Sequence, residues 1–167
     1  KIGAEFLTYS YYKEYGCNVK TVRISAIQGL YQQYDEQRIF NEITRCVIEN
    51  RNLIMKSDGK SKKSIVYTLD AVSGILKVLF EGEKGEVYNI TNPQTFLAVK
   101  EFAEKIFAKF NDNVHIEFDI SPEAETGYLP HLEIVQSTEK IAKLGWKPIT
   151  DLYQIYETDL KRWNFLT

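Results

Sequence analysis

The stretch Val19-Lys20-Thr21-Val22-Arg23-Ile24-Ser25-Ala26-Ile27 decides the class of fold, because β-branched and apolar residues alternate along it. This alternation predicts a strand. Residues 2–15, just before it, predict a helix, and Gly16 is typical of the residue that ends a helix. A helix that leads through a short glycine joint into a strand is an α/β unit.

The rest of the chain repeats this alternation of helices and strands. The patterns predict strands at 53–55, 64–67, 86–90 and 115–118, and helices at 37–49, 68–82, 99–110, 137–145 and 151–163. A long polar stretch at 28–37 predicts a loop, and loops of that length are usually functional or mobile. Residues 119–134 predict irregular structure. The fold class is therefore α/β, and the short strands after residue 50 indicate a small mixed subdomain.

Two of the predicted helices carry clear apolar stripes. The first is formed by Val72, Ile75, Leu76, Leu79 and Phe80, and the second by Val99, Phe102, Ala103, Ile106, Phe107 and Phe110. Thr68 and Asp70 stand where a capping residue and a first-turn acid are expected in the first of these helices.

The composition narrows the classes of function. The chain has 167 residues, a hydrophobic content of 44% and a net charge of −2, which suits one sizeable core and argues against a nucleic-acid binder. The basic run at 60–63 predicts a solvated loop. Neither the two cysteines nor His115 and His131 have metal-ligand spacing, and His115 is expected to face solvent from its strand. No signal peptide and no membrane-spanning run is found, so we expect a cytoplasmic protein without a membrane partner.

No glycine-rich dinucleotide loop follows any predicted strand. The chain therefore offers no pyrophosphate-binding loop of its own.

Four segments together resemble the C-terminal half of extended short-chain dehydrogenases, the NAD-dependent sugar epimerases and dehydratases. They are the helix from Lys1 with the strand ending at Arg23-Ile24-Ser25, the run from Ser57-Asp58-Gly59 to Lys63-Ser64-Ile65-Val66-Tyr67-Thr68-Leu69-Asp70-Ala71-Val72, the strand Gly85-Glu86-Val87-Tyr88-Asn89-Ile90, and Lys143-Leu144-Gly145-Trp146-Lys147-Pro148. Their order and spacing cover nearly the whole chain. The resemblance implies a Rossmann-like fold of which residues 1–30 are a remnant of the NAD-binding domain. Residues 31–167 would be mostly the substrate-binding subdomain, with elements near 64–90 returning to the Rossmann sheet.

The resemblance also implies a chemistry. Lys1 matches the lysine of the family's Tyr-x-x-x-Lys motif, whose tyrosine acts as acid and base on a sugar hydroxyl while the lysine lowers its pKa and holds the nicotinamide ribose. Ser25, Ala26 and Ile27 would line the nicotinamide end of the site. The cofactor would be NAD or NADP in the parent protein, and we expect none to bind to this chain alone.

For the nucleotide-diphosphate sugar, the resemblance implies cationic contacts. Lys63 takes the place of the family's arginine before the aromatic strand, while Arg38, Lys56 and Gln94 are the other candidate substrate contacts. A second family arginine is expected within 119–130, but this stretch has no Arg or Lys and carries acids at Asp119, Glu123 and Glu125. The family's Tyr-Gly-Pro is also reduced to Gln28-Gly29-Leu30.

Two functions follow from this pattern. The first is the substrate-binding portion of an NAD(P)-dependent nucleotide-sugar epimerase or dehydratase, an isomerase or lyase of polysaccharide biosynthesis that acts by transient oxidation of a sugar hydroxyl. The second is a non-catalytic nucleotide-sugar-binding or assembly module that has lost turnover. A homodimer through the first helix, where Tyr9, Tyr11, Tyr12 and Tyr15 cluster, is expected from the resemblance.

Overall fold

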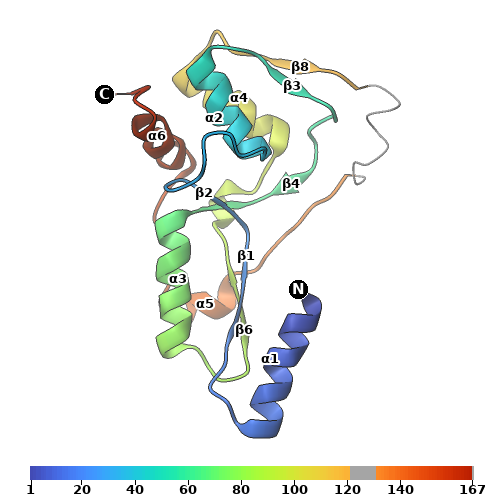
Figure 1. Cartoon of the computed structure of the whole chain (residues 1–167), viewed down its shortest axis with the longest axis vertical. Coiled ribbons are helices and arrows are strands. Elements are labelled where there is room, and N and C mark those ends of the chain that lie inside the picture. The colour runs from blue at the N-terminus through green and yellow to red at the C-terminus, as the bar shows by residue number, and fades with distance from the viewer. Residues whose placement is uncertain (121–130, 167) are drawn as a thin grey trace. The chain divides into compact units, whose positions relative to one another are not determined.

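The computed structural model describes residues 1–120 and 131–166 and divides into two compact units (Figure 1). Unit 1 comprises residues 1–27, 65–93 and 136–150, and unit 2 comprises 28–64, 94–135 and 151–167. Most of the predicted irregular stretch, with Pro122, Gly127 and Pro130, lies outside the described residues, as do Glu123 and Glu125.

Parallel strands form the centre of unit 1. Strand β1 (Thr21–Ile24) pairs in parallel with β6 (Val87–Ile90), from Thr21 opposite Val87 to Ile24 opposite Ile90, and β2 (Ala26–Gln28) pairs with β5 (Ile65–Tyr67). The prediction of one continuous strand over 19–27 is wrong in this respect. The chain changes pairing partner at Ser25, whose amide still donates to the carbonyl of Ile90 at 3.1 Å, so that two short strands replace one.

Helix α3 (Thr68–Glu81) packs on these strands through small residues. Ala71, Gly74 and Val78 are buried, and a Cβ at Gly74 would lie 3.1 Å from side-chain atoms of both Ile90 and Trp146. Because the small residues allow this close approach, the helix turns its large apolar residues outward. The predicted stripe is therefore exposed: Val72, Ile75, Leu76, Leu79 and Phe80 all lie at the surface, together with Leu69.

The prediction that Thr68 caps this helix is wrong, whereas Asp70 lies in its first turn as predicted. The N-cap is Tyr67, without a side-chain capping bond. The Asp70 carboxylate instead accepts hydrogen bonds from the amides of Ile149 and Thr150, at 3.3 and 3.0 Å. Asp70 thus joins α3 to the connection that follows Trp146.

Helix α1 (Ile2–Tyr15) ends, as predicted, at Gly16, which has the left-handed conformation with φ 66°. The helix buries none of its residues, and it is joined to β1 by the ion pair between Glu5 and Arg23. Figure 1 shows α1 and α3 on either side of β1 and β6. The short helix α5 (Glu139–Ala142) completes unit 1, through the ion pair of Lys140 with Glu86.

Three helices form the core of unit 2. These are α2 (Ile39–Glu49), α4 (Val99–Phe110) and α6 (Leu152–Arg162), each close to its predicted bounds. The rings of Phe40 and Phe102 meet edge to face at 5.0 Å between centroids, and Ile43, Ile106 and Ile155 are fully buried. Helix α6 starts at a capping box in which Asp151 accepts from the amide of Gln154.

Short strands surround this helical core. Strand β3 (Leu53–Met55) runs parallel to β8 (Ile116–Phe118), while β4 (Lys62–Lys63) is antiparallel to β7 (Leu97–Ala98). The single-turn 3₁₀ helix η1 (Pro93–Thr95) precedes β7. The prediction that 60–63 is a solvated loop is wrong for Lys62 and Lys63, which are half-buried in β4 because their backbone pairs with β7. His115 is exposed, as predicted.

Within the described residues, no helix is both long and apolar enough to span a bilayer, and no group of three metal-binding side chains is found. Both cysteines are free thiols, with Cys46 buried and Cys17 half-buried.

Candidate functional site

Unit 2 contains a cleft of about 810 Å³ between the exposed side of α2 and strands β3 and β4. Its described lining comprises Gln37, Ile39, Glu42, Arg45, Ile54, Met55, Lys56, Ser57, Gly59, Ser61, Lys62, Lys63, Val99, Leu132 and Ile134. The volume is typical of a site for a nucleotide-sized ligand.

Cationic side chains dominate the polar part of this cleft. Lys56, Lys62, Lys63 and Arg45 face it, together with the hydroxyl groups of Ser57 and Ser61. Lys62 pairs with Glu133 at 3.1 Å, and the Lys63 Nζ lies 5.4 Å from the centre of the Phe40 ring. Ammonium groups and serine hydroxyls are donors to phosphate oxygens, so the cleft suits an anionic ligand.

A glycine shapes the floor of the cleft between β3 and β4. Gly59 has φ 68°, and a Cβ there would lie 2.6 Å from the methyl carbon of Met55 and 2.9 Å from the Cβ of Lys100. The turn that contains Gly59 is closed by a hydrogen bond of 3.1 Å from the backbone amide of Lys60 to the carboxylate of Asp58. Only glycine fits this turn without moving its neighbours.

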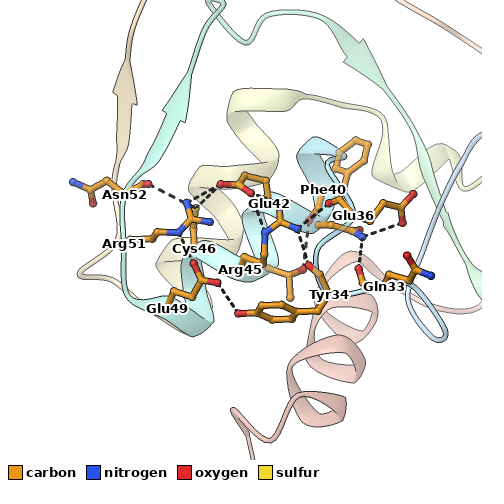
Figure 2. A network of polar contacts seen from close by, with 12 residues as sticks. Gln33, Tyr34, Glu36, Phe40, Glu42, Arg45, Cys46, Glu49, Arg51 and Asn52 are labelled. Carbon is orange, nitrogen blue, oxygen red and sulfur yellow. Dashed lines mark hydrogen bonds and ion pairs between the residues drawn. The ribbon is translucent and has the colours of Figure 1, made fainter.

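A network of ionic contacts supports the α2 side of the cleft (Figure 2). Glu42 accepts from Arg51 at 2.7 Å and from Arg45, whose Nη1 also donates to the backbone carbonyls of Tyr34 and Glu36 at 2.6 and 2.9 Å. Burial alone would raise the pKa of Glu42, but the hydrogen bonds from Arg51 and Arg45 outweigh it and lower the pKa. Glu42 therefore stays ionised at neutral pH.

Other titratable groups of this network are held in their neutral form. Burial and the hydrogen bond to Glu49 raise the pKa of Tyr34 to about 12. Burial raises the pKa of the Cys46 thiol to about 11. A thiol with such a pKa is a poor nucleophile, so Cys46 has a packing role.

Side chains from α2 and α6 hold the loop that leads from β2 into α2. Besides the contacts of Arg45, Asn41 donates to the carbonyl of Gln33 at 3.4 Å and Arg162 donates to that of Gln32 at 2.9 Å. At the start of the loop, the amide of Gln28 donates to the Asp159 carboxylate at 2.8 Å. The loop thus has no helix or strand of its own and takes its shape from these donors and acceptors.

The residues that sequence reasoning assigned to the substrate are partly brought together. Lys56 and Lys63 both line the cleft. Arg38 is the N-cap of α2 and pairs with Glu36, and Gln94 lies in η1, so neither belongs to the described lining.

Sequence reasoning missed three charged lining residues, Glu42, Arg45 and Lys62. Glu42 and Arg45 follow Ile39 at three-residue steps, which places all three on one half-buried side of α2. This spacing was the available signal. Lys62 belonged to the basic run that we predicted to be solvated.

In unit 1, two hydroxyl groups lie at the carboxyl ends of the central parallel strands. Ser25 follows β1 and Thr91 follows β6, directly after the paired residues Ile24 and Ile90. Both hydroxyl oxygens are buried without a hydrogen-bond partner. Ligands of parallel α/β sheets bind at this edge, so these two groups suit a polar ligand such as a nicotinamide cofactor. Thr91 was not predicted.

The remaining predicted cofactor residues are also in unit 1. Ala26 and Ile27 lie in β2 and are half-buried. Lys1 is exposed and stands immediately before α1, where it makes no side-chain capping bond.

Comparison with known proteins now identifies the family. Residues 1–91 match the model of the NAD dependent epimerase/dehydratase family. The chain belongs to this family. The match covers α1 and the strands β1 to β6, including Ser25 and Thr91.

Curated relatives of this epimerase/dehydratase family member are sugar-nucleotide enzymes. The chain is 28% identical to UDP-glucuronic acid decarboxylase 2 of Arabidopsis thaliana over 90% of its length and 33% of that enzyme. It is 29% identical to the dTDP-D-glucose 4,6-dehydratase of Mus musculus over 89% of its length and 41% of that enzyme. The chain thus spans a third to two fifths of these relatives.

Solved structures show the same fold. Pal from Bacillus thuringiensis matches 97% of the chain, with 52% of its own chain covered, a TM-score of 0.81 and 20% identity. The dTDP-glucose 4,6-dehydratase DesIV from Streptomyces venezuelae, solved with NAD and TYD bound, matches 99% of the chain, with 51% of its own covered, a TM-score of 0.77 and 21% identity. The Rossmann-like α/β fold of the extended short-chain dehydrogenases, predicted from the sequence, is confirmed.

Proposed function

We propose that the chain is the substrate-binding portion of an NAD(P)-dependent nucleotide-sugar epimerase or dehydratase, and that the cleft of unit 2 binds the diphosphate of the nucleotide sugar. The observation that carries this proposal is the convergence of Lys56, Lys62, Lys63 and Arg45 on a cleft of about 810 Å³. Relatives named for UDP and dTDP sugars support the class of ligand.

The cleft's charges account for binding to a diphosphate. Four cations and one ionised carboxylate, Glu42, face it among the described residues, which leaves an excess of three positive charges before Glu133 offsets Lys62. Because Arg45 is held by Glu42 and by loop carbonyls, we assign the direct phosphate contacts to Lys56 and Lys63, with Ser57 and Ser61 as neutral donors.

The remaining steps belong to unit 1. When bound, NAD or NADP would supply reversible oxidation of a sugar alcohol, in which the hydride leaves the carbon that bears the hydroxyl group and the hydroxyl proton passes to a base. Ser25 and Thr91 would contact this cofactor with their buried hydroxyl groups. The charge of Lys1 would favour the ionised form of the tyrosine that the family's Tyr-x-x-x-Lys motif uses as its general base. A nearby cation lowers the pKa of a phenol.

A calorimetric titration with UDP, dTDP, GDP and CDP tests the proposal. We expect one nucleotide diphosphate to bind, and Lys63→Met to weaken its binding roughly ten- to hundredfold, since one charge-assisted hydrogen bond is worth about 1.5 to 3 kcal/mol. The matched control is Lys147→Met, which removes a lysine of unit 1 that does not line the cleft. Absence of binding by every nucleotide in a folded sample would reject the proposal.

A second function, a non-catalytic nucleotide-sugar-binding module, is favoured by one observation. Residues 119–130 contain no Arg or Lys, where the resemblance places a second arginine for the diphosphate. The two functions differ in turnover, and the test uses a protein in which this chain is joined to the NAD-binding part of the family: the enzyme reduces NAD transiently in the presence of its sugar nucleotide, which absorbance at 340 nm detects, whereas the module binds the sugar nucleotide without that signal.

A further inference from the structure

We propose that Asp159 is a positioning residue that fixes the loop from Gln28 to Arg38, and thereby the end of the cleft that this loop forms. The inference rests on the proposed function only for what the cleft binds. It is carried by a contact that neither the resemblance nor the comparisons assign.

The contact between Asp159 and Gln28 is buried and joins distant parts of the chain. Asp159, on the last turns of α6, is 4% exposed, and Gln28, the last residue of β2, is 2% exposed. The Gln28 amide donates to the carboxylate across 131 positions of sequence. A hydrogen bond between two buried side chains restrains both elements, because breaking it removes the hydrogen bond of the buried Asp159 carboxyl group.

The loop that starts at Gln28 ends in the cleft. Gln37 and Ile39 line the cleft on either side of Arg38, the N-cap of α2. The loop is anchored at its middle by Arg45 and Arg162, and Tyr34 of the loop stacks edge to face on Trp163 at 4.9 Å. A shift of Gln28 therefore reaches the cleft through the loop 28–38. The other side chains that hold this loop come from α2 and from the end of α6.

The surroundings of Asp159 leave its charge poorly compensated. A cavity of about 10 Å³, the space of one water molecule, adjoins it and is lined also by Asn41, whose Oδ1 is buried without a hydrogen-bond partner. Among the described residues, Asp159 has its one hydrogen bond from Gln28 and forms no ion pair. A cavity of this size beside the buried carboxyl group leaves room for one water molecule to hydrate it.

The titratable groups near Asp159 lie on α6, on α2 and in the loop. On α6 itself these are Arg162 and the fully buried Tyr156; Arg45 on α2 and Tyr34 of the loop line the same cavity. On α4, the charged residues beside α6 are Glu104, Lys105 and Lys109, which line an exposed pocket with Tyr153 and do not contribute to the pKa of Asp159. Burial raises this pKa to about 6, against smaller opposing effects of Gln28 and Arg162.

Two states of the loop follow from this arrangement. Below pH 6 the carboxyl group is neutral and its burial against Gln28 has little cost, so the loop is held. Above pH 6 the ionised group gains from hydration, which favours opening of the contact and admits water to the cavity. The cleft is expected to bind its anion more tightly in the held state.

The test is hydrogen exchange of residues 28–38, compared between the whole chain and Asp159→Asn at pH 5 and pH 7.5. Asparagine has the same shape and cannot ionise. We expect equal exchange at pH 5, and at pH 7.5 three- to tenfold faster exchange in the wild type than in Asp159→Asn. The control Glu157→Gln removes an exposed carboxylate of the same helix and should keep the wild-type pH dependence.

A second measurement links the loop to the cleft. The affinity for UDP-glucose, whose diphosphate does not titrate between pH 5 and 7.5, should fall three- to tenfold in the wild type over this range and stay constant in Asp159→Asn. Equal exchange of wild type and Asp159→Asn at both pH values would overturn the positioning role. Loss of all UDP-glucose binding with a normal exchange difference would reject the proposed ligand and leave the positioning role standing.

Discussion

Lysine stands at position 63, where the family resemblance places an arginine, and it sits over the Phe40 ring at the edge of the cleft. A lysine offers one compact charge, whereas the planar fork of arginine donates two parallel hydrogen bonds to a phosphate. Position 63 therefore keeps the positive charge found in the family but lacks the two parallel hydrogen bonds that an arginine donates to a phosphate.

Replacing Lys63 with arginine should therefore tighten nucleotide-diphosphate binding. We expect two- to tenfold higher affinity, or about 0.4 to 1.4 kcal/mol, because the second hydrogen bond is gained at an existing cationic position. Calorimetry with the tightest of the four nucleotides measures it, and Lys147→Arg is the matched control. Unchanged affinity would show that Lys63 does not touch the phosphates.

The buried carboxyl group of Asp159 makes stability depend on pH. Its folded-state pKa is raised from 3.8 to about 6, so the folded state binds the proton more tightly than the unfolded chain. The resulting loss of folding stability is absent below pH 3.8, grows as the pH rises from 3.8 to about 6, and is complete above pH 6. At pH 7 it amounts to about 3 kcal/mol at most.

Asp159→Asn should consequently be more stable than the wild type at pH 7, by about 1 to 3 kcal/mol in the free energy of unfolding. The two proteins should be equally stable near pH 3.5, where the carboxyl group is protonated in both states. Urea denaturation at a series of pH values measures the difference. A less stable variant at pH 7 would mean that the ionised carboxylate is satisfied by groups other than Gln28.

At the scale of elements, the periodicity of the sequence identified every long helix to within a few residues. Such stripes are set locally by burial and helical spacing, and those of α2 and α4 face the core as expected. The apolar stripe of α3 did not predict the buried side of this helix. The side of a helix that packs depends on how closely the neighbouring strands can approach it. The small residues Ala71 and Gly74 allow the strands to pack closely on α3, and a local sequence pattern does not give the distance between helix and strands.

The site was predictable only in part, for the same physical reason. Lys56 and Lys63 were found because each occupies a position that a family motif marks. Arg45 and Glu42 line the cleft through the tertiary packing of α2 against β3 and β4, and Thr91 meets Ser25 only through the register of β1 and β6. Contacts of this kind join residues far apart in sequence, which a single sequence does not reveal.

The seating of α1 on unit 1 depends on a glycine of another element. Gly85 has φ 78°, and a Cβ there would collide with the ring of Tyr12 in α1. Gly145 has nearly the same conformation, with φ 83°, but open space around it. Comparing substitutions at Gly85 and Gly145 therefore separates the cost of the left-handed backbone from the cost of the collision with Tyr12.

Gly85→Ala should therefore destabilise the protein by about 2 to 4 kcal/mol, against about 1 kcal/mol for Gly145→Ala, where only the left-handed backbone is penalised. Thermal denaturation of both variants gives the comparison. Equal losses would indicate that Tyr12 moves aside freely and that α1 is held by Glu5 and Arg23 alone.

At the scale of the whole molecule, apolar surface gathers on two helices of unit 1. On α1, Ile2, Phe6, Leu7, Tyr9, Tyr11 and Tyr15 are exposed, and on α3 the six large residues of the outward stripe are exposed. Many exposed large apolar residues on one helix are typical of a face that another protein surface covers. The homodimer expected from the resemblance would use the α1 face.

The chain should accordingly self-associate at micromolar concentration. Phe6→Glu on α1 and Leu79→Glu on α3 each place a charge in one of the two faces, and sedimentation velocity tells which of them restores a monomer, because a carboxylate buried in an apolar contact is strongly unfavourable. Ile149→Glu is the control, since Ile149 is 80% exposed and lies on neither helix. If Phe6→Glu alone yields a monomer, association uses α1, as in the expected homodimer; if Leu79→Glu alone does so, the outward stripe of α3 is the contact. A wild-type chain that sediments as a monomer at 100 µM would contradict both.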